Sequence, residues 1–436
     1  MPAGPDTDVD VIVIGATLAG LAAAARLAKA GHRVALVSDG LEPGGPWAGR
    51  PLDAPSGPVI DDAPPVLTLP AAWRDLFRKS GRPLDAELAR SGWELAPAPP
   101  ARHRFPDGSE LRLPTDRGEQ YTALSETYGS AAADRWRDLL DDLDEVWQTL
   151  RPLGLESELH GRFQLTRRVE TILKSKISID RLAELQGHPA LQALVRDVAY
   201  LQGSVPSSSP AHAAVDLAVL RRFGRWTMRR ADGTETGRTS ALIEAVAGRL
   251  ATRKVTTIDS AATKIMIENG RPVGVITEAG TFRSRAAIST VDPPRVLDQL
   301  LADVELPPQR ATLRRLRPAL APTVTATRLP GPVTDELTET VQHRAGAGPL
   351  VTVVRRAGDT MVELSYDYAR PRPDWSRGLA WRGFGGWLVR PPIRGPLPGL
   401  YQAGPFSAAG PGLSQTLLSG ALASYACHDD LTAEHL

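Results

Sequence analysis

The chain has 436 residues, with 51 lysines and arginines against 50 aspartates and glutamates, so its formal net charge is +1. This balance gives no basic field to attract nucleic acid, and the 42% hydrophobic content is ordinary for a globular protein. One cysteine, Cys427, excludes an internal disulfide, and no Cys or His spacing indicates a metal site. No apolar run is long enough to cross a membrane and MPAGPDTDVD lacks signal-peptide features, so we expect a cytoplasmic protein of two domains, or of one with a large insertion.

The first forty residues predict a strand, a glycine turn, a helix and a second strand. Val9–Ile14 is a short apolar run rich in β-branched residues, which is typical of a buried parallel strand, and Gly15 ends it. Good helix formers predominate from Leu18 to Ala30, and Arg33–Val37 is predicted as the second strand. This order of elements is the context in which a glycine turn binds a dinucleotide.

Each position of the turn has a task in such a fold. Gly15 makes the tight turn, and Gly20 lets helix and strand pack closely. Between them, the position of Thr17 lets the pyrophosphate approach the backbone, and the pyrophosphate meets the free N–H groups at the start of the helix. Thr17 stands where a second glycine is usual. Its branched side chain crowds the phosphate but also offers a hydroxyl, so we expect weakened rather than abolished binding.

The end of the second strand departs from the dinucleotide pattern as well. Ser38 stands where a carboxylate is expected to bind the ribose hydroxyls, and Asp39 follows it. Asp39 serves only if the turn rotates its side chain inward. Two interpretations stay open: a working dinucleotide site, and a nucleotide fold that is kept for stability alone.

Two segments in the middle of the chain have clear patterns. Apolar residues at 136, 139, 140, 143, 146 and 147 predict an amphipathic helix over 131–151, with Trp136 and Trp147 in the core. SVPSSSP at 204–210 predicts a flexible loop because of its serines and prolines. We expect most of the eight histidines on the surface.

The C-terminal part carries an aromatic stretch and a glycine-rich turn. RGLAWRGFGGWLVRPP at 377–392 contains Trp381, Phe384 and Trp387, which line an apolar channel, touch a membrane surface or cover a sheet edge. In AGPFSAAGPGLSQ, at 403–415, glycines precede a helix that begins at Leu413 or Ser414. Such a helix start either points its N–H groups at a ligand or is simply capped by Ser414.

Four segments resemble the bacterial phytoene desaturases within the flavin amine oxidase superfamily. They are VIDDAPPVLTLPAAWRDLFRK at 59–79, RHRFPDGSELRLPTD at 102–116, KIMIENGRPVGVITEAGTFRSRAAISTVDPP at 264–294 and GLYQAGPFSAAGPGLSQTLLSGALA at 399–423. The resemblance implies an α/β fold, with a Rossmann-type FAD-binding domain assembled from separated segments and an inserted α+β substrate domain. Residues 1–75, 230–300 and 385–436 would form the first domain, and 76–229 and 301–384 the second.

The resemblance also implies FAD as cofactor and assigns its contacts, residue by residue. They are Gly15, Ala16, Thr17, Gly20, Ser38, Asp39, Gly44, Gly45, Ala262, Gly404, Pro405, Gly412, Leu413 and Ser414. Several positions depart from the family pattern. Pro46 replaces the arginine after two glycines, Pro405 replaces an acid that many flavin amine oxidases have, and Ala408–Ala409 replaces His–Pro. Together with Thr17 and Ser38, these changes cluster around one cofactor.

Two functions follow from the resemblance. The first is an FAD-dependent oxidoreductase that desaturates, saturates, isomerises or cyclises a hydrophobic isoprenoid or polyene, with Trp381, Phe384 and Trp387 at the substrate. The alternative is a paralogue with weakened or lost FAD binding that acts as a non-redox catalyst or a lipid or prenyl carrier. A flavin amine oxidase ranks third. The sequence assigns no catalytic residue, and a peripheral contact with a membrane stays open.

Overall fold

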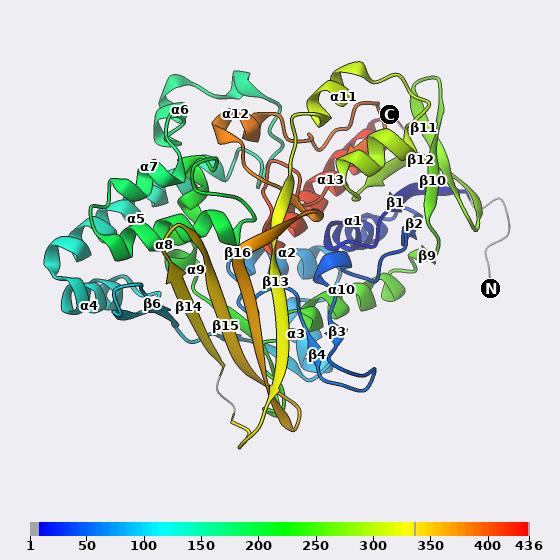
Figure 1. Cartoon of the computed structure of the whole chain (residues 1–436). Coiled ribbons are helices and arrows are strands. Elements are labelled where there is room, and N and C mark those ends of the chain that lie inside the picture. The colour runs from blue at the N-terminus through cyan, green and yellow to red at the C-terminus, as the bar shows by residue number, and fades with distance from the viewer. Residues whose placement is uncertain (1–7, 335–336, 435–436) are drawn as a thin grey trace.

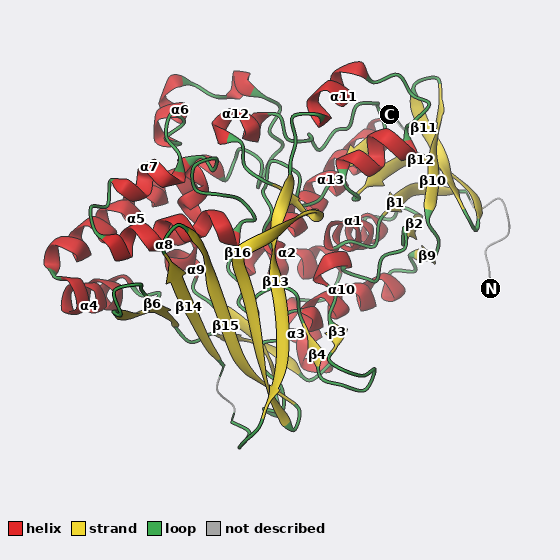
Figure 2. Cartoon of the chain, viewed as in Figure 1, coloured by secondary structure: helices red, strands yellow, loops and turns green. Residues whose placement is uncertain are grey.

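The computed structural model describes residues 8–334 and 337–434, and all structural statements concern these. Two sheets dominate them (Figures 1 and 2). In Figure 1 the seven-stranded sheet lies on the right with its helices, and the six-stranded sheet runs down the middle beside the helices on the left. No helix within these residues is long and apolar enough to cross a membrane.

The seven-stranded sheet has the order β10-β11-β12-β1-β2-β9, and β17 pairs with β12 beside this path. Its strands are β1 (Val9–Ile14), β2 (Val34–Val37), β9 (Thr256–Ile258), β10 (Ala262–Glu268), β11 (Arg271–Thr277), β12 (Gly280–Ser289) and β17 (Leu400–Gln402). The pairs β9–β2, β2–β1, β1–β12 and β12–β17 are parallel, while β10 and β11 continue the sheet as an antiparallel hairpin. Segments far apart in the sequence therefore meet around β1.

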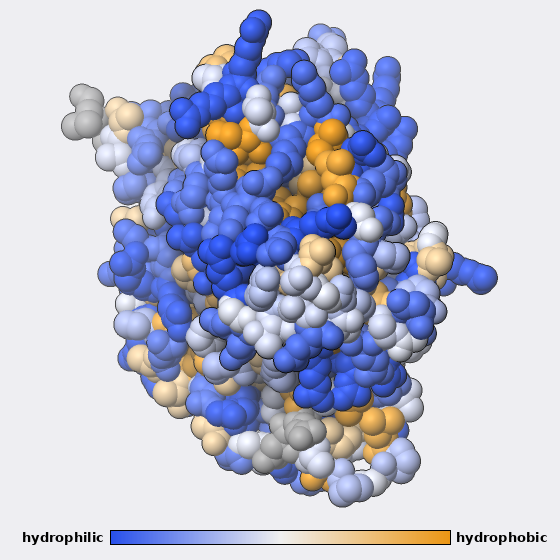
Figure 3. Space-filling view, turned by 90° about the vertical axis from the view of Figure 1, so that its left-hand side faces the viewer, coloured by the Kyte–Doolittle hydropathy of each residue, from blue (hydrophilic) through white to orange (hydrophobic). Residues whose placement is uncertain are grey.

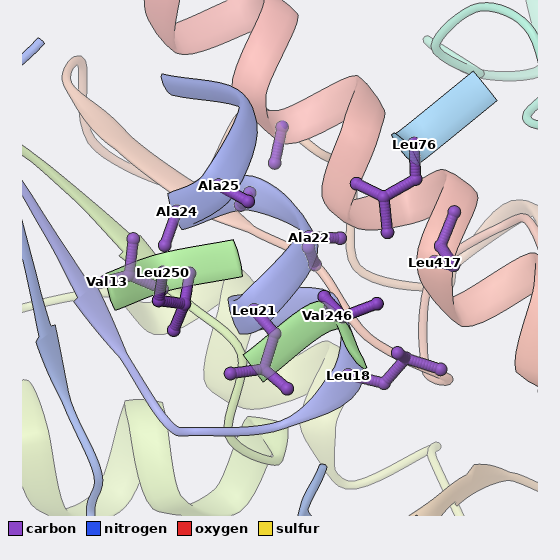
Figure 4. Close-up of a cluster of buried hydrophobic side chains, with 14 of the residues drawn as sticks. Val13, Leu18, Leu21, Ala22, Ala24, Ala25, Leu76, Val246, Leu250 and Leu417 are labelled. Carbon is purple, nitrogen blue, oxygen red and sulfur yellow. The ribbon is translucent and has the colours of Figure 1, made fainter. Parts of the chain in front are cut away.

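Helix α1 (Leu18–Lys29) is buried over most of its length because it is packed on several sides. Its neighbours are α2 (Pro70–Ser80), α10 (Ser240–Thr252) and α13 (Leu413–Ala433). Figure 4 shows its alanines among larger side chains such as Leu76, Val246 and Leu417. Small side chains let the helices approach closely, and a Cβ at Gly420 of α13 would lie 2.4 Å from the carbonyl oxygen of Ala19.

The six-stranded sheet has the order β13-β16-β15-β14-β6-β7. Its strands are β6 (Ala101–Arg104), β7 (Glu110–Leu113), β13 (Pro318–Leu329), β14 (Thr338–Arg344), β15 (Ala347–Ala357) and β16 (Thr360–Leu379). Neighbouring strands are antiparallel except β14 and β6. Two short pairs complete the strands: β3 (Arg50–Pro51) with β4 (Val59–Ile60), and β5 (Trp93–Pro97) with β8 (Trp226–Arg230).

Most of the remaining helices form a second core. They are α4 (Arg117–Tyr128), α5 (Ser130–Leu150), α6 (Arg167–Ile172), α7 (Ile179–Glu184), α8 (Pro189–Leu201), α9 (Asp216–Phe223) and α12 (Gly383–Leu388). By contrast, α3 (Leu84–Arg90) packs in the core around α1, and α11 (Pro307–Leu313) has no buried residue. Helix α5 has the predicted amphipathic stripe, and Trp136 and Trp147 are buried in it. That stripe packs against residues of α8 and α9 in one hydrophobic cluster.

The strands of the two sheets fall in the two sets of segments predicted for the two domains, while the domain boundaries stay a prediction. The segment 204–210 is a loop, but it is packed rather than exposed: Ser204 and Ser209 are buried. The Ser204 hydroxyl accepts a hydrogen bond from the backbone of Trp381 at 3.0 Å. The serines and prolines predicted the loop, and a hydrogen bond between a serine side chain and the backbone explains why the loop is fixed against the protein.

Candidate functional site

Two glycines make the turn between β1 and α1 tight. Gly15 has a φ of +99°, and a Cβ there would lie 2.8 Å from Thr290 Oγ1. A Cβ at Gly20 would lie 2.2 Å from the carbonyl oxygen of Gly15. Both positions therefore need glycine for the helix to pack against the strand.

Thr17 is the N-cap of α1, and its hydroxyl is in use within the protein. Thr17 Oγ1 accepts from the backbone of Gly20 at 3.2 Å and donates to Thr290 Oγ1 at 2.9 Å. The exposed fractions are 2% for Ala16, 9% for Thr17 and 0% for Leu18. Protein therefore covers the helix start, and the Thr17 hydroxyl is not offered to a phosphate in this conformation.

The loop with Gly44 and Gly45 lies directly against this turn. The Gly44 amide donates to the carbonyl oxygen of Ala16 at 2.7 Å, and a Cβ at Gly45 would lie 3.6 Å from Thr17 Cα. Gly44 has a φ of +102°, and a Cβ there would lie 2.5 Å from Ile243 Cγ2. The two glycines thus let the loop close over the start of α1.

The residues after β2 are also tied to the protein. Ser38 is buried, and its hydroxyl donates to Asp259 Oδ1 at 3.0 Å and accepts from the backbone of Ser260 at 3.2 Å. Asp39 accepts from the backbone of Ala262 at 2.8 Å and forms an ion pair with Arg295 at 2.9 Å. The structure therefore brings the predicted cofactor contacts Asp39 and Ala262 together, but they form a hydrogen bond with each other and not with a ligand.

The second predicted contact region is the start of α13, which begins at Leu413 with Gly412 as N-cap. Ser414 does not cap the helix. Its hydroxyl accepts from Trp73 Nε1 at 3.2 Å and donates to the carbonyl oxygen of Thr68 at 3.0 Å, so it joins α13 to α2. The alternative of a side-chain cap by Ser414 is wrong, because that hydroxyl is bonded elsewhere.

Gly404 and Pro405 are buried behind this helix start. The Gly404 amide donates to Ser419 Oγ at 2.9 Å, and a Cβ at Gly378 would lie 2.6 Å from the carbonyl oxygen of Pro405. The buried Arg390 donates to the carbonyl oxygens of Leu379, Pro405 and Ser407 at 2.8, 3.4 and 3.3 Å. Burial lowers the pKa of Arg390 to about 9, and carbonyl oxygens rather than a carboxylate satisfy this cation.

A cavity of about 300 Å³ opens at the start of α13. Its walls come from α5, α8, α9, α12 and the loop 408–413, and most lining side chains are apolar. Trp47, Trp147, Trp381 and Trp387 all contribute to them. This volume lies at the lower end of the range of small-molecule sites. Gly412 and Leu413 also line it, so part of the predicted cofactor region and part of the predicted substrate region share one space.

Hydrogen bonds fix the two predicted indoles of this cavity. Trp381 Nε1 donates to Gln202 Oε1 at 2.8 Å, and Trp387 Nε1 donates to the carbonyl oxygen of Ala408 at 3.0 Å. Only 6% of Trp381 and 1% of Trp387 is exposed, so neither indole reaches a membrane surface in this conformation. Phe384 packs at 5.6 Å from Trp387, between ring centroids.

His212 is the polar residue of this aromatic group that the sequence interpretation missed. It lies in the turn η3 (Ala211–Val215), with ring centroids at 5.7, 5.5 and 5.0 Å from Trp381, Phe384 and Trp387. Both ring nitrogens are buried and make no hydrogen bond among the described residues. Burial, and after it the charge of Arg390, lowers the pKa of His212 to about 3, so the ring is neutral at physiological pH.

Comparisons with known proteins place these features in a family context. A family model described as FAD dependent oxidoreductase matches residues 10–100. A hydroxyneurosporene desaturase of Rhodobacter capsulatus is 28% identical over 329 residues, which cover 73% of this chain and 63% of that protein. A phytoene dehydrogenase of Streptomyces griseus is 34% identical over 212 residues, which cover 48% of this chain and 40% of that protein. The chain is thus similar to carotenoid desaturases over part of its length.

This chain resembles solved structures over almost its full length. A putrescine oxidase aligns with a TM-score of 0.68 at 14% identity, over 98% of this chain and 100% of the other. Cyclohexylamine oxidase from Brevibacterium oxydans aligns with a TM-score of 0.65 at 17% identity, over the same shares. The fold is therefore the Rossmann-type fold of flavin oxidases, and together with the family model it supports FAD as the cofactor.

The residues of this chain do not fit a whole FAD in this conformation. A dinucleotide needs free N–H groups at the start of α1 and a free carboxylate after β2. Here the helix start is buried under Gly44 and Gly45, Ser38 is neutral and bonded to Asp259, and Asp39 is ion-paired. The start of α13 differs, because a cavity lies in front of it.

A second group of buried polar side chains lies away from the cavity at the start of α13. His343 Nδ1 is 2.6 Å from Asp197 Oδ2, and His343 Nε2 is 3.0 Å from His103 Nδ1. His212 and His343 are buried, so the expectation of mostly exposed histidines does not hold for these two. No group of three or more His, Cys, Asp or Glu within the described residues could hold a metal ion.

Proposed function

We propose that this protein is an FAD-dependent oxidoreductase of the phytoene desaturase type that acts on carbon–carbon bonds of a hydrophobic polyene or isoprenoid. The observation that carries the proposal is the apolar cavity at the start of α13. Relatives named as desaturases and a phytoene dehydrogenase support it, although their matches span 63% or less of their own length. FAD supplies the redox chemistry in such enzymes, and the protein supplies binding and orientation.

The walls of the cavity suit a conjugated or branched hydrocarbon. The indole N–H groups of Trp381 and Trp387 are bonded to protein oxygens, so the rings are held in place and a ligand meets their carbon faces. Burial raises the pKa of Asp216, the carboxyl group in the lining, and Gln202 donates to this group at 2.7 Å. A cationic amine finds no free, exposed carboxylate in these walls, which argues against an amine oxidase.

The covered start of α1 and the paired residues after β2 favour a second candidate function. A protein of this fold that does not retain FAD would use the same cavity to bind a prenyl or polyene chain, as a non-redox catalyst or a carrier. The specific observation behind it is the burial of Ala16, Thr17 and Leu18 together with the Asp39–Arg295 pair. Both candidates share the ligand class and differ in the cofactor.

One experiment separates the two candidates. The full chain is freed of small molecules, titrated with FAD by flavin fluorescence, and incubated with phytoene in liposomes with a quinone as electron acceptor. Products with a longer chromophore that appear only with FAD support the oxidoreductase. Binding of the polyene without any conversion supports the carrier. Hydrogen peroxide released from small amines, with no conversion of phytoene, contradicts both.

The contribution of the cavity is tested by one variant and one matched control. Trp387→Ala removes an indole from the cavity wall and should weaken polyene binding. Phe163→Ala removes an aromatic ring that is 81% exposed and should leave binding unchanged. Equal effects of the two substitutions would show that the ligand binds elsewhere.

The proposed peripheral contact with a membrane is a separate question. The face shown in Figure 3 is largely hydrophilic, and its hydrophobic residues form separate patches. The large apolar or aromatic side chains with the greatest exposed fractions are Phe163 at 81% and Leu185 at 57%. Co-sedimentation with lipid vesicles, with and without FAD, tests this contact.

A further inference from the structure

Three segments meet where β2 ends. Asp39 follows β2 with a φ of 54°, Ala262 is the first residue of β10, and Arg295 begins the short helix η4 (Arg295–Leu300) after β12. The side chain of Asp39 is 6% exposed and that of Arg295 is 24% exposed. This corner therefore lies just inside the protein surface.

The polar atoms of this corner bond to one another. Arg295 Nη2 donates to Asp39 Oδ1 at 2.9 Å and Arg295 Nε donates to Asp39 Oδ2 at 3.2 Å, which is the bidentate geometry of a guanidinium on a carboxylate. Arg295 Nη2 also donates to the carbonyl oxygen of Ala262 at 2.6 Å. The amide of Ala262 donates to Asp39 Oδ1 at 2.8 Å. Both backbone groups of Ala262 are thus engaged.

The same corner is where a doubly wound fold binds the adenosine half of a dinucleotide. The crevice lies outside the carboxyl ends of the strands, and a carboxylate after the second strand binds the ribose hydroxyls. An adenine ring is flat and presents donors and acceptors at its edge, and the guanidinium is also flat and presents donors. The Arg295 side chain therefore makes hydrogen bonds of the kind that a bound adenosine would make here.

We propose that Arg295 is an internal competitor of the cofactor: its guanidinium holds Asp39 and Ala262, and an adenine dinucleotide binds only after this Asp39–Arg295 pair opens. The inference rests on the proposed function, in which FAD is the cofactor. Because only the open form is competent to bind, the apparent affinity for FAD is reduced by the population of that form. The pair then sets how much of the protein carries cofactor at a given FAD concentration.

A purely structural role for the pair makes a different prediction. If Arg295 only joins η4 and β10 to the end of β2, its removal lowers stability and leaves nucleotide affinity unchanged. Charge alone also predicts the opposite of our proposal, because removal of a cation weakens the binding of an anionic nucleotide. A gain of affinity on removing Arg295 is therefore specific to competition.

The test uses ADP and FAD as probes and the full chain, with affinities from calorimetry. ADP contains the adenosine end but no flavin, so it reports on this corner independently of redox activity. Arg295→Ala should bind both probes about tenfold more tightly or better, the scale of one charge-assisted hydrogen bond that no longer has to be displaced. Arg283→Ala is the matched control, because Arg283 is an exposed arginine of the same sheet that is 3.7 Å from Glu268.

A second variant covers the case in which Arg295→Ala does not fold. Arg295→Met keeps most of the side-chain length but makes no hydrogen bond to Asp39 or Ala262, and it should tighten ADP binding as well. Unchanged affinity for ADP in both folded variants overturns the proposal, whether the unmodified chain binds ADP tightly or not at all. Tighter ADP binding without conversion of phytoene in any variant leaves this inference standing and contradicts the proposed oxidoreductase.

Discussion

Replacing Gly20 with alanine is expected to destabilise the protein, although alanine is the better helix former. A Cβ at Gly20 would lie 2.2 Å from the carbonyl oxygen of Gly15 and 3.0 Å from Thr290 Oγ1. The first of these obstacles is backbone, so α1 must move away from β1. Overpacking of this kind costs about 3 kcal/mol at the upper end of its usual range. The helix propensity of alanine returns about 1 kcal/mol, so the expected net loss is about 2 kcal/mol.

Gly248 in α10 is the matched control, since it is also a helix residue and a Cβ there meets nothing within 4 Å. Gly248→Ala should stabilise the protein by about 0.5–1 kcal/mol, because only the propensity changes. Urea unfolding followed by far-UV circular dichroism measures both variants under one condition. If Gly20→Ala is as stable as Gly248→Ala, the close contact between α1 and β1 does not exist and the reasoning is wrong.

Three further outcomes are expected. Trp387→Ala should weaken polyene binding and, because the indole is buried and bonded to Ala408, should also cost about 3–5 kcal/mol of stability; unchanged polyene binding in the folded variant would place the ligand outside the cavity. His212 has a folded pKa of about 3 against an unfolded value near 6.5, so the unfolded chain binds more protons and stability falls as pH drops through this window. His212→Phe should remove about 1.4 kcal/mol of this loss per pH unit in urea titrations, and an identical slope would refute it. Ser38→Glu should lower stability and leave FAD affinity unimproved, because the new carboxylate meets Asp259, and improved affinity would contradict that geometry.

Local patterns predicted the elements that lie along one stretch of chain. The strand β1, the helix α1 and the amphipathic helix α5 follow from hydrophobic periodicity and glycine, because these signals act within a few residues. The start of α13 at Leu413 follows from the glycines before it. The predicted ends differ by about one residue, since a helix end frays without a fixed boundary.

The partners of the candidate site could not be predicted in the same way. Ser38 meets Asp259, 221 residues further along, and Asp39 meets Arg295, 256 residues further along. No local pattern marks Arg295 as the partner of a residue after β2. The gain from such a pair depends on the sheet that brings both segments together, which single-sequence reasoning does not determine. His212 was missed for a related reason, because its aromatic neighbours come from a distant segment.

The arrangement of the seven-stranded sheet has a consequence for biosynthesis. On one side β1 pairs with β2, the next strand in the sequence. On its other side β1 pairs with β12, with Ile14 opposite Ser289, and β12 in turn pairs with β17. The buried alanines of α1 gain their cover from α10 and α13. While the ribosome is still adding these segments, the first helix exposes its apolar surface to water without its packing partners. Long-range pairing of this kind slows folding and lengthens the time in which such a surface can aggregate, so a nascent chain of this protein is a natural client for chaperones that shield hydrophobic segments.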